Sequence, residues 1–413
     1  MADICDFRIV RVPVRNGAIR ISDKGQKTCD PDIKKCVSDK RKKQMNSSYT
    51  FGFIGLGLIG GSIAKALRKV YTDCRKLLFT RSGSTYSMAI ADGVADEKLD
   101  LHDDRWAGCD YIFLCAPVET NNALLSDIAP QIGPGTIITD VGSVKGPILD
   151  EVISLSLEEH FIGGHPMAGS ERYGYANSNP AILENAYYIL APTDKVPTER
   201  VYELREIVES IGTIPLILDA RLHDYVTGAI SHLPHVISAA LVNLVHDEDN
   251  ADGIMKLVAA GGFKDITRIS SSSPDIWQQI CLTNKENILT LLDHYMSSLE
   301  TIRDEISRTE EKRIHEFFEK ARAYRESFTN SNAGPIKTEY VITVDIADKP
   351  GAIATIASIL SEESINIKNI GINHNREFQQ GALRIEFYRK EDTEAAIRIM
   401  IDNGYVIHSK DNA

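Results

Sequence analysis

The sequence lacks the marks of a membrane, secreted or nucleic-acid-binding protein. No apolar run approaches the length of a membrane span, and the N-terminus has no apolar core of a secretory signal. The seven cysteines are an odd number without metal-type CxxC pairing, which favours reduced thiols and a cytoplasmic location. The net charge of −12 argues against nucleic acid as a partner.

What the sequence does have is the composition of an ordinary globular protein. Its 413 residues, 43% apolar and 25% charged, are enough for two or three domains. The N-terminal part differs from the rest, because residues 1–44 carry 12 Lys and Arg against 6 Asp and Glu. We predict that residues 1–48 form a basic, poorly ordered extension. The alternative is a basic arm that binds a partner.

A glycine-rich turn follows the first strongly apolar segment. Phe51–Ile54 predicts a buried strand, and the apolar spacing after Gly61 predicts a helix. Between them stands G-x-G-x-x-G, in which Gly55 allows the turn, Gly57 lets a pyrophosphate approach the backbone, and Gly60 lets helix and strand pack closely. The helix N-terminus offers free N–H groups to the phosphates. The predicted cofactor-binding residues here are Gly55, Gly57, Leu58, Ile59 and Gly60.

The second strand of this unit indicates which dinucleotide binds. Lys76–Thr80 reads as that strand, and Thr80 occupies the place where NAD-binding units usually carry an acidic residue for the ribose 2′-hydroxyl. Without a carboxylate there is no repulsion of a 2′-phosphate, and Arg81 can pair with one. The cofactor is therefore NAD or NADP, and Thr80 and Arg81 favour NADP. The alternative is that Arg81 is an ordinary surface residue.

Two later strands end in polar loops. Tyr111–Cys115 is followed by Pro117, and Gly135–Thr139 is followed by Ser143 and Lys145. In an open parallel sheet, ligands bind beyond the carboxyl ends of the strands. We therefore expect Pro117, Ser143 and Lys145 to lie on one rim, facing the nicotinamide.

His165 is the main candidate for a proton acceptor. It stands between Gly163-Gly164 and Pro166, which predicts a loop, where a merely packed core histidine is uncommon. Imidazole titrates near neutrality, so it can accept a proton from a hydroxyl while hydride leaves the same carbon. Glu171, six residues further on, is a candidate for orienting a group or gating the cleft.

From residue 220 to about residue 328 the pattern is helical, with few glycines. His232 and His235 lie three residues apart and therefore on one face of a helix. With His223 and Asp224 upstream, a metal site is conceivable, but no further ligand set with zinc spacing follows, and we predict no metal. His235 is better explained as a substrate or cofactor contact.

Gly261-Gly262 predicts a break in this helical pattern, and Arg268 follows shortly after it. A guanidinium group binds a carboxylate in bidentate fashion, so Arg268 is the candidate anchor for an acidic substrate. The alternative is that Arg268 pairs with Asp265 or stabilises a helix end.

Taken together, these motifs resemble prephenate dehydrogenases over roughly residues 50–410. The matching blocks, in the order of that family, are Gly55–Gly60, Asp140–Lys145, Gly164–Glu171, Ser231–His235 and Gly262–Arg268. The blocks GGHPMAGSE and SHLPH are specific to that family rather than to Rossmann proteins at large. The resemblance implies an α/β Rossmann-type nucleotide-binding domain at 49–219 and an all-α dimerisation domain at 220–328. It also implies a homodimer with the active site in the cleft between the two domains.

The resemblance implies the reaction and the roles of the site residues. The reaction is oxidative decarboxylation of prephenate to 4-hydroxyphenylpyruvate, a step toward tyrosine. His165 would withdraw the ring hydroxyl proton, Ser143 would assist at the hydroxyl and nicotinamide, and Arg268 would bind a substrate carboxylate. The expected substrate contacts are Ser231, His235, Glu171 and Trp277. Thr80-Arg81 departs from the family's commonest pattern, which leaves the cofactor choice open.

A third unit follows a predicted linker at 329–337, where Asn, Ser, Gly and Pro cluster. Residues 338–410 read as βαββαβ, the order of a ferredoxin-like α+β fold. The segments around Asp348–Gly351 and Asn366 resemble the ACT regulatory domain, which implies feedback inhibition by tyrosine. Asp348, Gly351 and Asn366 are the expected regulatory contacts. The alternative is a dimerisation module that binds no ligand.

Three other functions remain open at this point. An arogenate dehydrogenase would use the same scaffold on a substrate with an amino group in place of the side-chain keto group. A catalytically inert amino-acid sensor would keep the dehydrogenase body, although His165, Ser143 and Arg268 are all present. A hydroxyacid dehydrogenase for another substrate would leave the GGHPMAGSE block unexplained.

Overall fold

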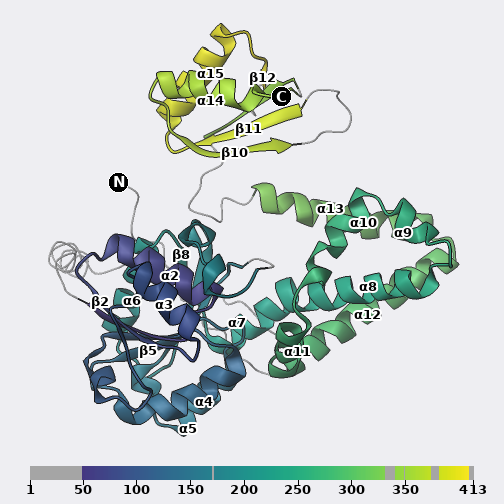
Figure 1. The fold of residues 1–413 in the computed structure, drawn as a ribbon. Helices are drawn as coiled ribbons and strands as arrows, with labels where there is room; N and C mark the ends of the chain where they lie inside the picture. The colour runs from purple at the N-terminus through teal and green to yellow at the C-terminus, as the bar shows by residue number, and fades with distance from the viewer. Residues whose placement is uncertain (1–48, 170–171, 331–339, 348, 374–380, 409–413) are drawn as a thin grey trace. The chain divides into compact units, whose positions relative to one another are not determined.

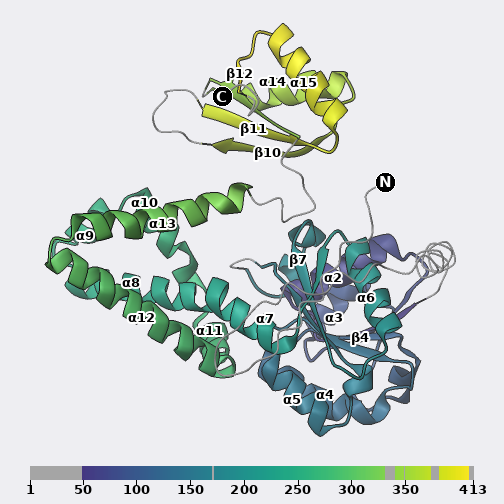
Figure 2. The ribbon, with the colours of Figure 1, turned by 180° about the vertical axis from the view of Figure 1, so that it is seen from behind.

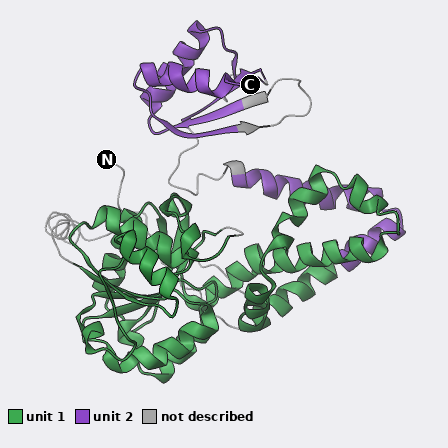
Figure 3. Ribbon diagram, viewed as in Figure 1, with its two compact units in different colours: residues 1–298 green, residues 299–413 purple. Residues whose placement is uncertain are grey.

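A computed structural model describes residues 49–169, 172–330, 340–347, 349–373 and 381–408. The predicted extension at 1–48 lies outside these described residues. The chain divides into two compact units, residues 1–298 and residues 299–413 (Figure 3). The division falls within the helix α12 (Lys285–Ser307), so the first unit contains the nucleotide-binding region together with most of the helical region.

A five-stranded parallel sheet forms the centre of the first unit. Its strands, in spatial order, are β3 (Glu97–Lys98), β2 (Arg75–Phe79), β1 (Thr50–Ile54), β4 (Tyr111–Leu114) and β5 (Ile137–Asp140). This is the strand order of a doubly wound dinucleotide-binding fold, in which the chain reverses direction of winding beside β1. The predicted Rossmann-type domain is confirmed.

Helices cover both faces of this sheet, and two hydrophobic cores result (Figure 1). On one face, Phe53 and Phe113 pack beneath α2 (Leu58–Val70) and α6 (Thr198–Ser210), with α3 (Gly83–Ala91) at the side. On the other face, Ile54, Ile112 and Leu114 pack beneath α4 (Val118–Ile128) and α5 (Gly146–Ser154). The central strands are buried on both faces, which explains their continuous apolar sequences.

A smaller sheet lies beside β5. It consists of β6 (Ile162–Pro166), β7 (Tyr187–Pro192) and β8 (Ile214–Ile217), with β6 antiparallel and β8 parallel to β7. A parallel bridge between Ile138 and Phe161 connects it to the main sheet. The short 3-10 helices of this region are Asp104–Gly108, Ala129–Gln131, Glu158–His160, Tyr175–Asn177 and Pro180–Leu183.

The prediction that His165 lies in a loop is wrong, because it is the fourth residue of β6 and pairs with Ile189. The flanking glycines serve close packing rather than a turn. A Cβ on Gly164 would lie 2.4 Å from the carbonyl oxygen of Asp140, so only glycine lets β6 approach β5 this closely. Pro166 is tolerated because β6 is an edge strand of its sheet.

The helical region of the first unit begins at α7 (Ala220–Thr227), capped by the Asp219 side chain. A π-helical turn (Gly228–His232) leads into α8 (Leu233–Glu248). This π-helical turn ends two residues before Pro234. In a regular α-helix, Pro234 would lack an N–H to donate and its ring would clash with the carbonyl four residues earlier, and the wider turn relieves that clash. The remaining elements are α9 (Ile254–Val258), α10 (Gly261–Thr267), the 3-10 turn η7 (Arg268–Ser271), α11 (Pro274–Thr283) and α12 (Figure 2).

Two details of this region correct the sequence predictions. The chain leaves the helix at Ala259-Ala260, and Gly261-Gly262 begin the next helix instead of forming the break. The continuous helical stretch Ala220–Glu248 is also long and apolar enough to meet a criterion for a membrane span, with a mean hydropathy of 1.4. Polar residues such as Ser231 and His235 interrupt the apolar runs of this stretch, which is why no uninterrupted run in the sequence suggested a membrane span. One such helix is weak support for a membrane segment.

The second unit contains α13 (Glu311–Asn330) and a four-stranded antiparallel sheet. Helix α13 extends to the second residue of the predicted linker. The sheet order is β10 (Ile367–Asn373), β11 (Gly381–Phe387), β9 (Val341–Ile346) and β12 (Ile407–His408). Two helices, α14 (Ala352–Glu362) and α15 (Lys390–Asp402), pack with this sheet in one core. The chain order of these elements is the predicted βαββαβ.

Candidate active site

The three glycines of the first turn differ in what the fold requires of them. Gly55 has φ +83°, a conformation that favours glycine. A Cβ on Gly60 would lie 2.6 Å from the Cβ of Cys115 at the end of β4. Gly57 has φ −96°, and a Cβ there would meet nothing within 4 Å. The fold therefore needs Gly55 and Gly60, whereas the absence of a side chain at Gly57 leaves open space at the N-terminus of α2, where Leu58 and Ile59 form the first turn. This is the geometry that a pyrophosphate requires.

The turn after β2 presents hydroxyl groups and one cation. Thr80 is buried, and its Oγ1 accepts a hydrogen bond from the N–H of Ser82 at 3.3 Å. The Ser82 side chain caps α3 and lies 2.9 Å from the hydroxyl of Ser84. The Arg81 side chain is exposed. No carboxylate stands at positions 80–85, so the turn contains no group that repels a phosphate.

The carboxyl ends of β4 and β5 carry Pro117 and Ser143. Pro117 is exposed at the start of α4, and Ser143 is half-buried in the loop after β5. Both lie beyond the carboxyl ends of parallel strands, the edge of such a sheet at which ligands bind.

Lys145 does not share that rim, so this part of the prediction is wrong. It is 1% exposed, forms an ion pair with the equally buried Asp140, and donates to the carbonyl of Gly164 at 2.8 Å. Asp140 also accepts from the N–H groups of Gly142 (2.8 Å) and Gly164 (3.0 Å). A buried ammonium needs a carboxylate partner, and this pair fixes β6 against β5 directly before His165.

His165 belongs to a hydrogen-bonded chain of three side chains. Its Nδ1 lies 2.8 Å from Nε2 of His223, and Nδ1 of His223 lies 2.8 Å from Oδ1 of Asp224. The Asp224 carboxylate is fixed in turn by the N–H groups of Lys145 and Gly146, each at 2.7 Å. His223 is fully buried and Asp224 is 5% exposed, so these two members of the chain are shielded from water, whereas His165 is half-buried.

The order of these groups assigns the histidine tautomers. Because a carboxylate only accepts hydrogen bonds, Nδ1 of His223 donates to Asp224, and its Nε2 is then the acceptor for the N–H at Nδ1 of His165. The lone pair of His165 consequently lies on Nε2. Burial is the first cause, followed by electrostatic interactions with His223, Lys145 and His232, and together they hold the pKa of His165 well below its usual value. His165 is thus neutral at neutral pH, with an unprotonated nitrogen that can accept a proton.

His232 is a packed structural histidine and not a ligand. It is 1% exposed, and its Nδ1 accepts from the amide of Asn284 at 2.9 Å. Asn284 also donates to the Asp224 carbonyl at 2.7 Å, so it ties α12 to the hydrogen-bonded chain. Burial lowers the pKa of His232 to about 4. Among the described residues, no group of three or more His, Cys, Asp and Glu side chains is arranged to hold a metal.

A second group of predicted residues meets on the helices. The His235 ring stacks on Trp277 with centroids 3.7 Å apart and planes at 22°, and its Nδ1 donates to the Ser231 carbonyl at 2.8 Å. Burial is the main cause that lowers the pKa of His235, the hydrogen bond to the Ser231 carbonyl opposes it, and the charge of Arg268 lowers the pKa further. Trp277 also contacts His232 edge-on, at 6.1 Å between centroids. The Ser231 carbonyl thus fixes the orientation of the His235 ring.

Several predicted residues belong to the second unit or fall outside the described residues. Glu171 and Asp348 are among the residues that the structure does not describe. Gly351 has φ +89° and directly precedes α14, and Asn366 is exposed just before β10. Sequence reasoning did not identify His223, Asp224 and Asn284 as partners of the site. The adjacent His223-Asp224 pair was noticed, but it suggested a metal.

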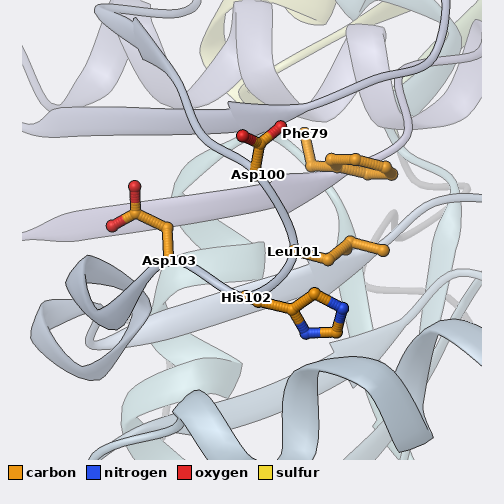
Figure 4. Close-up of a pocket in the computed structure, with 5 residues that line it drawn as sticks. All are labelled: Phe79, Asp100, Leu101, His102 and Asp103. Atoms are coloured by element: carbon orange, nitrogen blue, oxygen red, sulfur yellow. The ribbon is translucent and has the colours of Figure 1, made fainter.

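An open depression of about 600 Å³ lies elsewhere on the nucleotide-binding region, and Figure 4 shows its lining. The lining residues are Phe79, Asp100, Leu101, His102 and Asp103. None of the predicted site residues lines it, although Phe79 directly precedes Thr80. Asp103 points away from the side to which Leu101 and His102 extend.

Comparisons with known proteins match both the nucleotide-binding region and the helical region. The sequence matches the family description "Prephenate dehydrogenase, nucleotide-binding domain" over residues 63–214 and "Prephenate dehydrogenase, dimerization domain" over residues 219–320. It is 36% identical over 344 residues to the prephenate dehydrogenase of Bacillus subtilis, which covers 83% of this chain and 93% of that relative.

Two solved structures are also similar, each with 30% identity over 68% of this chain and 99% of the other. One is the prephenate dehydrogenase of A. aeolicus in complex with hydroxyphenyl propionate and NAD+, with a TM-score of 0.64. The other is the arogenate dehydrogenase of Synechocystis, with a TM-score of 0.62.

Proposed function

This chain belongs to the prephenate dehydrogenase family, and from that premise we propose how its residues catalyse the oxidative decarboxylation of prephenate. The observation that carries the proposal is the chain Asp224–His223–His165, which leaves an unprotonated nitrogen on His165. In this reaction a hydroxyl loses its proton while the carbon that bears it loses a hydride. A fixed, neutral imidazole is suited to accept that proton.

The proton and electrons can be followed through the reaction. His165 Nε2 accepts the proton of the substrate's ring hydroxyl, and the bond between the carbinol carbon and its hydrogen breaks. The bound nicotinamide supplies the acceptor for that hydride. The bond from the ring to its carboxylate then breaks, CO2 leaves, and the electron pair completes the aromatic ring as a phenolate. The phenolate oxygen takes the proton back from His165, which gives the hydroxyl of the product and restores the neutral imidazole. The hydrogen bond to His223 stabilises the imidazolium that His165 becomes, because Asp224 balances the charge.

The substrate contacts proposed for this chain come from the helical region, from the loop after β5 and from the segment after β6. Arg268 binds a substrate carboxylate, with His235 and Trp277 beside it and Ser231 holding the His235 ring. Ser143, at the end of β5, assists at the hydroxyl and nicotinamide. Glu171 follows the His165 block in the sequence and is proposed to orient the substrate or close the site.

The residues present fit an NAD(P) cofactor. The open space at Gly57 and the first turn of α2, at Leu58 and Ile59, would hold the pyrophosphate, with Pro117 near the nicotinamide. We favour NADP, because the exposed Arg81 and the hydroxyls of Ser82 and Ser84 offer donors to a 2′-phosphate and no carboxylate opposes it.

The second unit is proposed to be an ACT-type regulatory domain, at 338–410, that binds tyrosine. Its βαββαβ order and the left-handed Gly351 before α14 support this, because the free N–H groups of a helix start suit a carboxylate. Asp348 and Asn366 are the other proposed contacts. The remaining parts of the proposal are a homodimer formed through residues 220–328, a nucleotide-binding domain at 49–219, and a cytoplasmic location.

The test is an absorbance assay at the band of the reduced nicotinamide. We expect the full chain to reduce cofactor with prephenate, faster with NADP than with NAD, and to slow when tyrosine is added. His165→Ala should lose activity by a factor of about 10² to 10⁴, the usual contribution of a general base. An unchanged rate in this variant would refute the mechanism.

Arogenate is the alternative substrate, favoured by the similarity to the Synechocystis enzyme. Turnover of arogenate without turnover of prephenate would keep the mechanism and change the substrate. Inactivity with both, in a protein that still binds nucleotide, would instead indicate an amino-acid sensor. A rate unaffected by tyrosine would leave the second unit as a dimerisation module.

A further inference from the structure

Ser238 is the one polar side chain on α8 that is almost completely buried, at 1% exposure. Its hydroxyl lies 3.1 Å from the carbonyl oxygen of Ile266 and 2.6 Å from the hydroxyl of Ser270. A hydroxyl has a single proton, so Ser238 donates to the carbonyl of Ile266 and accepts from the hydroxyl of Ser270. The three groups form one directed chain between α8 and the next helical segment.

These two contacts lie on either side of Arg268. Ile266 precedes it by two residues in the last turn of α10, and Ser270 follows it by two residues in η7. The last carbonyls of a helix have no partner within the helix, so the Ser238 hydroxyl satisfies a group that would otherwise remain unpaired. The junction that carries Arg268 is therefore attached to α8 at two points.

The same face of α8 carries His235, three residues before Ser238. The attachment therefore holds the backbone at Arg268 beside the turn of α8 that carries His235, whose ring stacks on Trp277. We propose that Ser238 is a positioning residue that holds the Arg268 segment beside α8, so that the Arg268 guanidinium is in place to bind a substrate carboxylate. This inference rests on the proposed function of Arg268.

The experiment is a kinetic double-mutant cycle with Ser238→Ala and Arg268→Ala in the full chain. We expect Ser238→Ala to raise KM for prephenate roughly tenfold, with kcat within about twofold and KM for the cofactor unchanged, as expected when a hydrogen bond that positions a charge is lost. In the Arg268→Ala background, Ser238→Ala should add nothing, because it acts through Arg268.

Ser272→Ala is the matched control. The Ser272 hydroxyl also donates to a backbone carbonyl of this turn, that of Ile269 at 2.8 Å, but this bond does not reach α8. The KM of the Ser272→Ala variant for prephenate should stay at the wild-type value. Should Ser238→Ala fail to fold, Ser270→Ala removes the other end of the chain at a half-buried position and should show the same rise in KM.

Additive effects of Ser238→Ala and Arg268→Ala, an equal rise in Ser272→Ala, or a loss confined to kcat would each overturn the positioning role. Failure of the proposed function would look different, because the wild-type chain itself would not turn over prephenate.

Discussion

His165 depends on its neighbours for the protonation state that the reaction needs. Its low pKa comes first from burial and then from electrostatic interactions with its neighbours, Lys145 among them. A lowered pKa keeps the imidazole neutral to a lower pH, so the acid limb of kcat/KM should lie below about pH 6.5, the ordinary pKa of histidine. This pH profile is measurable with the assay described above.

Replacing His223 tests the same hydrogen-bonded chain. In His223→Ala the N–H of His165 loses its acceptor and the tautomer is no longer fixed, so we expect kcat to fall about 10- to 100-fold. His246→Ala, which alters an exposed pair with Asp247, is the control. A His223→Ala enzyme with the wild-type rate would contradict the assignment.

At this scale, sequence reasoning proposed the reacting residues but did not find the side chains that hold them. His165 and Arg268 carry recognisable chemistry within short motifs. His223, by contrast, acquires its role only when α7 packs beside β6, 58 residues away in the chain. Lys145 was predicted to face the nicotinamide because it follows β5 in the sequence. Its position after β5 is as expected, but the direction of its side chain is set by the ion pair with the buried carboxylate of Asp140.

The first βα turn gives a prediction at the level of elements. In Gly60→Ala the new methyl group would collide with the Cβ and Sγ of Cys115, 2.6 and 2.8 Å away, so α2 must move from the sheet. Overpacking of this kind costs about 1–3 kcal/mol, and the thermal midpoint of the full chain should fall by several degrees. Calorimetry or circular dichroism would detect it.

Gly57→Ala is the matched comparison within the same turn. The backbone conformation at Gly57 is open to alanine, and the methyl group would meet nothing within 4 Å, so stability should be unchanged or slightly higher. Cofactor affinity should nevertheless fall about tenfold or more, because the methyl group occupies the space of the pyrophosphate. Equal thermal midpoints for the two variants, or full cofactor affinity in Gly57→Ala, would show that the glycines do not have these separate roles.

The elements themselves were predictable where the local pattern was strong. The strands around Phe51 and Tyr111 are continuous apolar runs, and the helix after Gly60 has clear apolar spacing. Strand β6 was not predicted, because Gly163-Gly164 and Pro166 are typical of loops. Its glycines are instead required by contact with β5, a tertiary effect that no local pattern contains.

At the scale of the whole molecule, the helical region exposes more apolar surface than a monomer usually leaves in water. The most exposed apolar residues of residues 220–298 are Ile230, Leu244, Leu257, Val258, Ile266 and Leu282, at 57–77% exposure. The long apolar stretch Ala220–Glu248 is only 22% buried in its most apolar window. Either a second protein surface or a membrane would cover such a face, and the family description of residues 219–320 as a dimerization domain favours a second copy.

This argument predicts a dimer that a single charge can weaken. Light scattering after gel filtration should give twice the mass of one chain for the wild type. Leu257→Arg places a charge at the most exposed of these residues, at 77%, and should shift the protein toward the monomer on dilution, because burying an unpaired guanidinium in an apolar interface is costly. Ile153→Arg, on α5 of the nucleotide-binding region and 53% exposed, should leave the dimer intact.

A wild-type monomer, or equal dissociation in the two variants, would mean that the helical face is not the dimer interface. If the dimer persists in Leu257→Arg while dissociating in Ile153→Arg, the copies instead meet through the nucleotide-binding region.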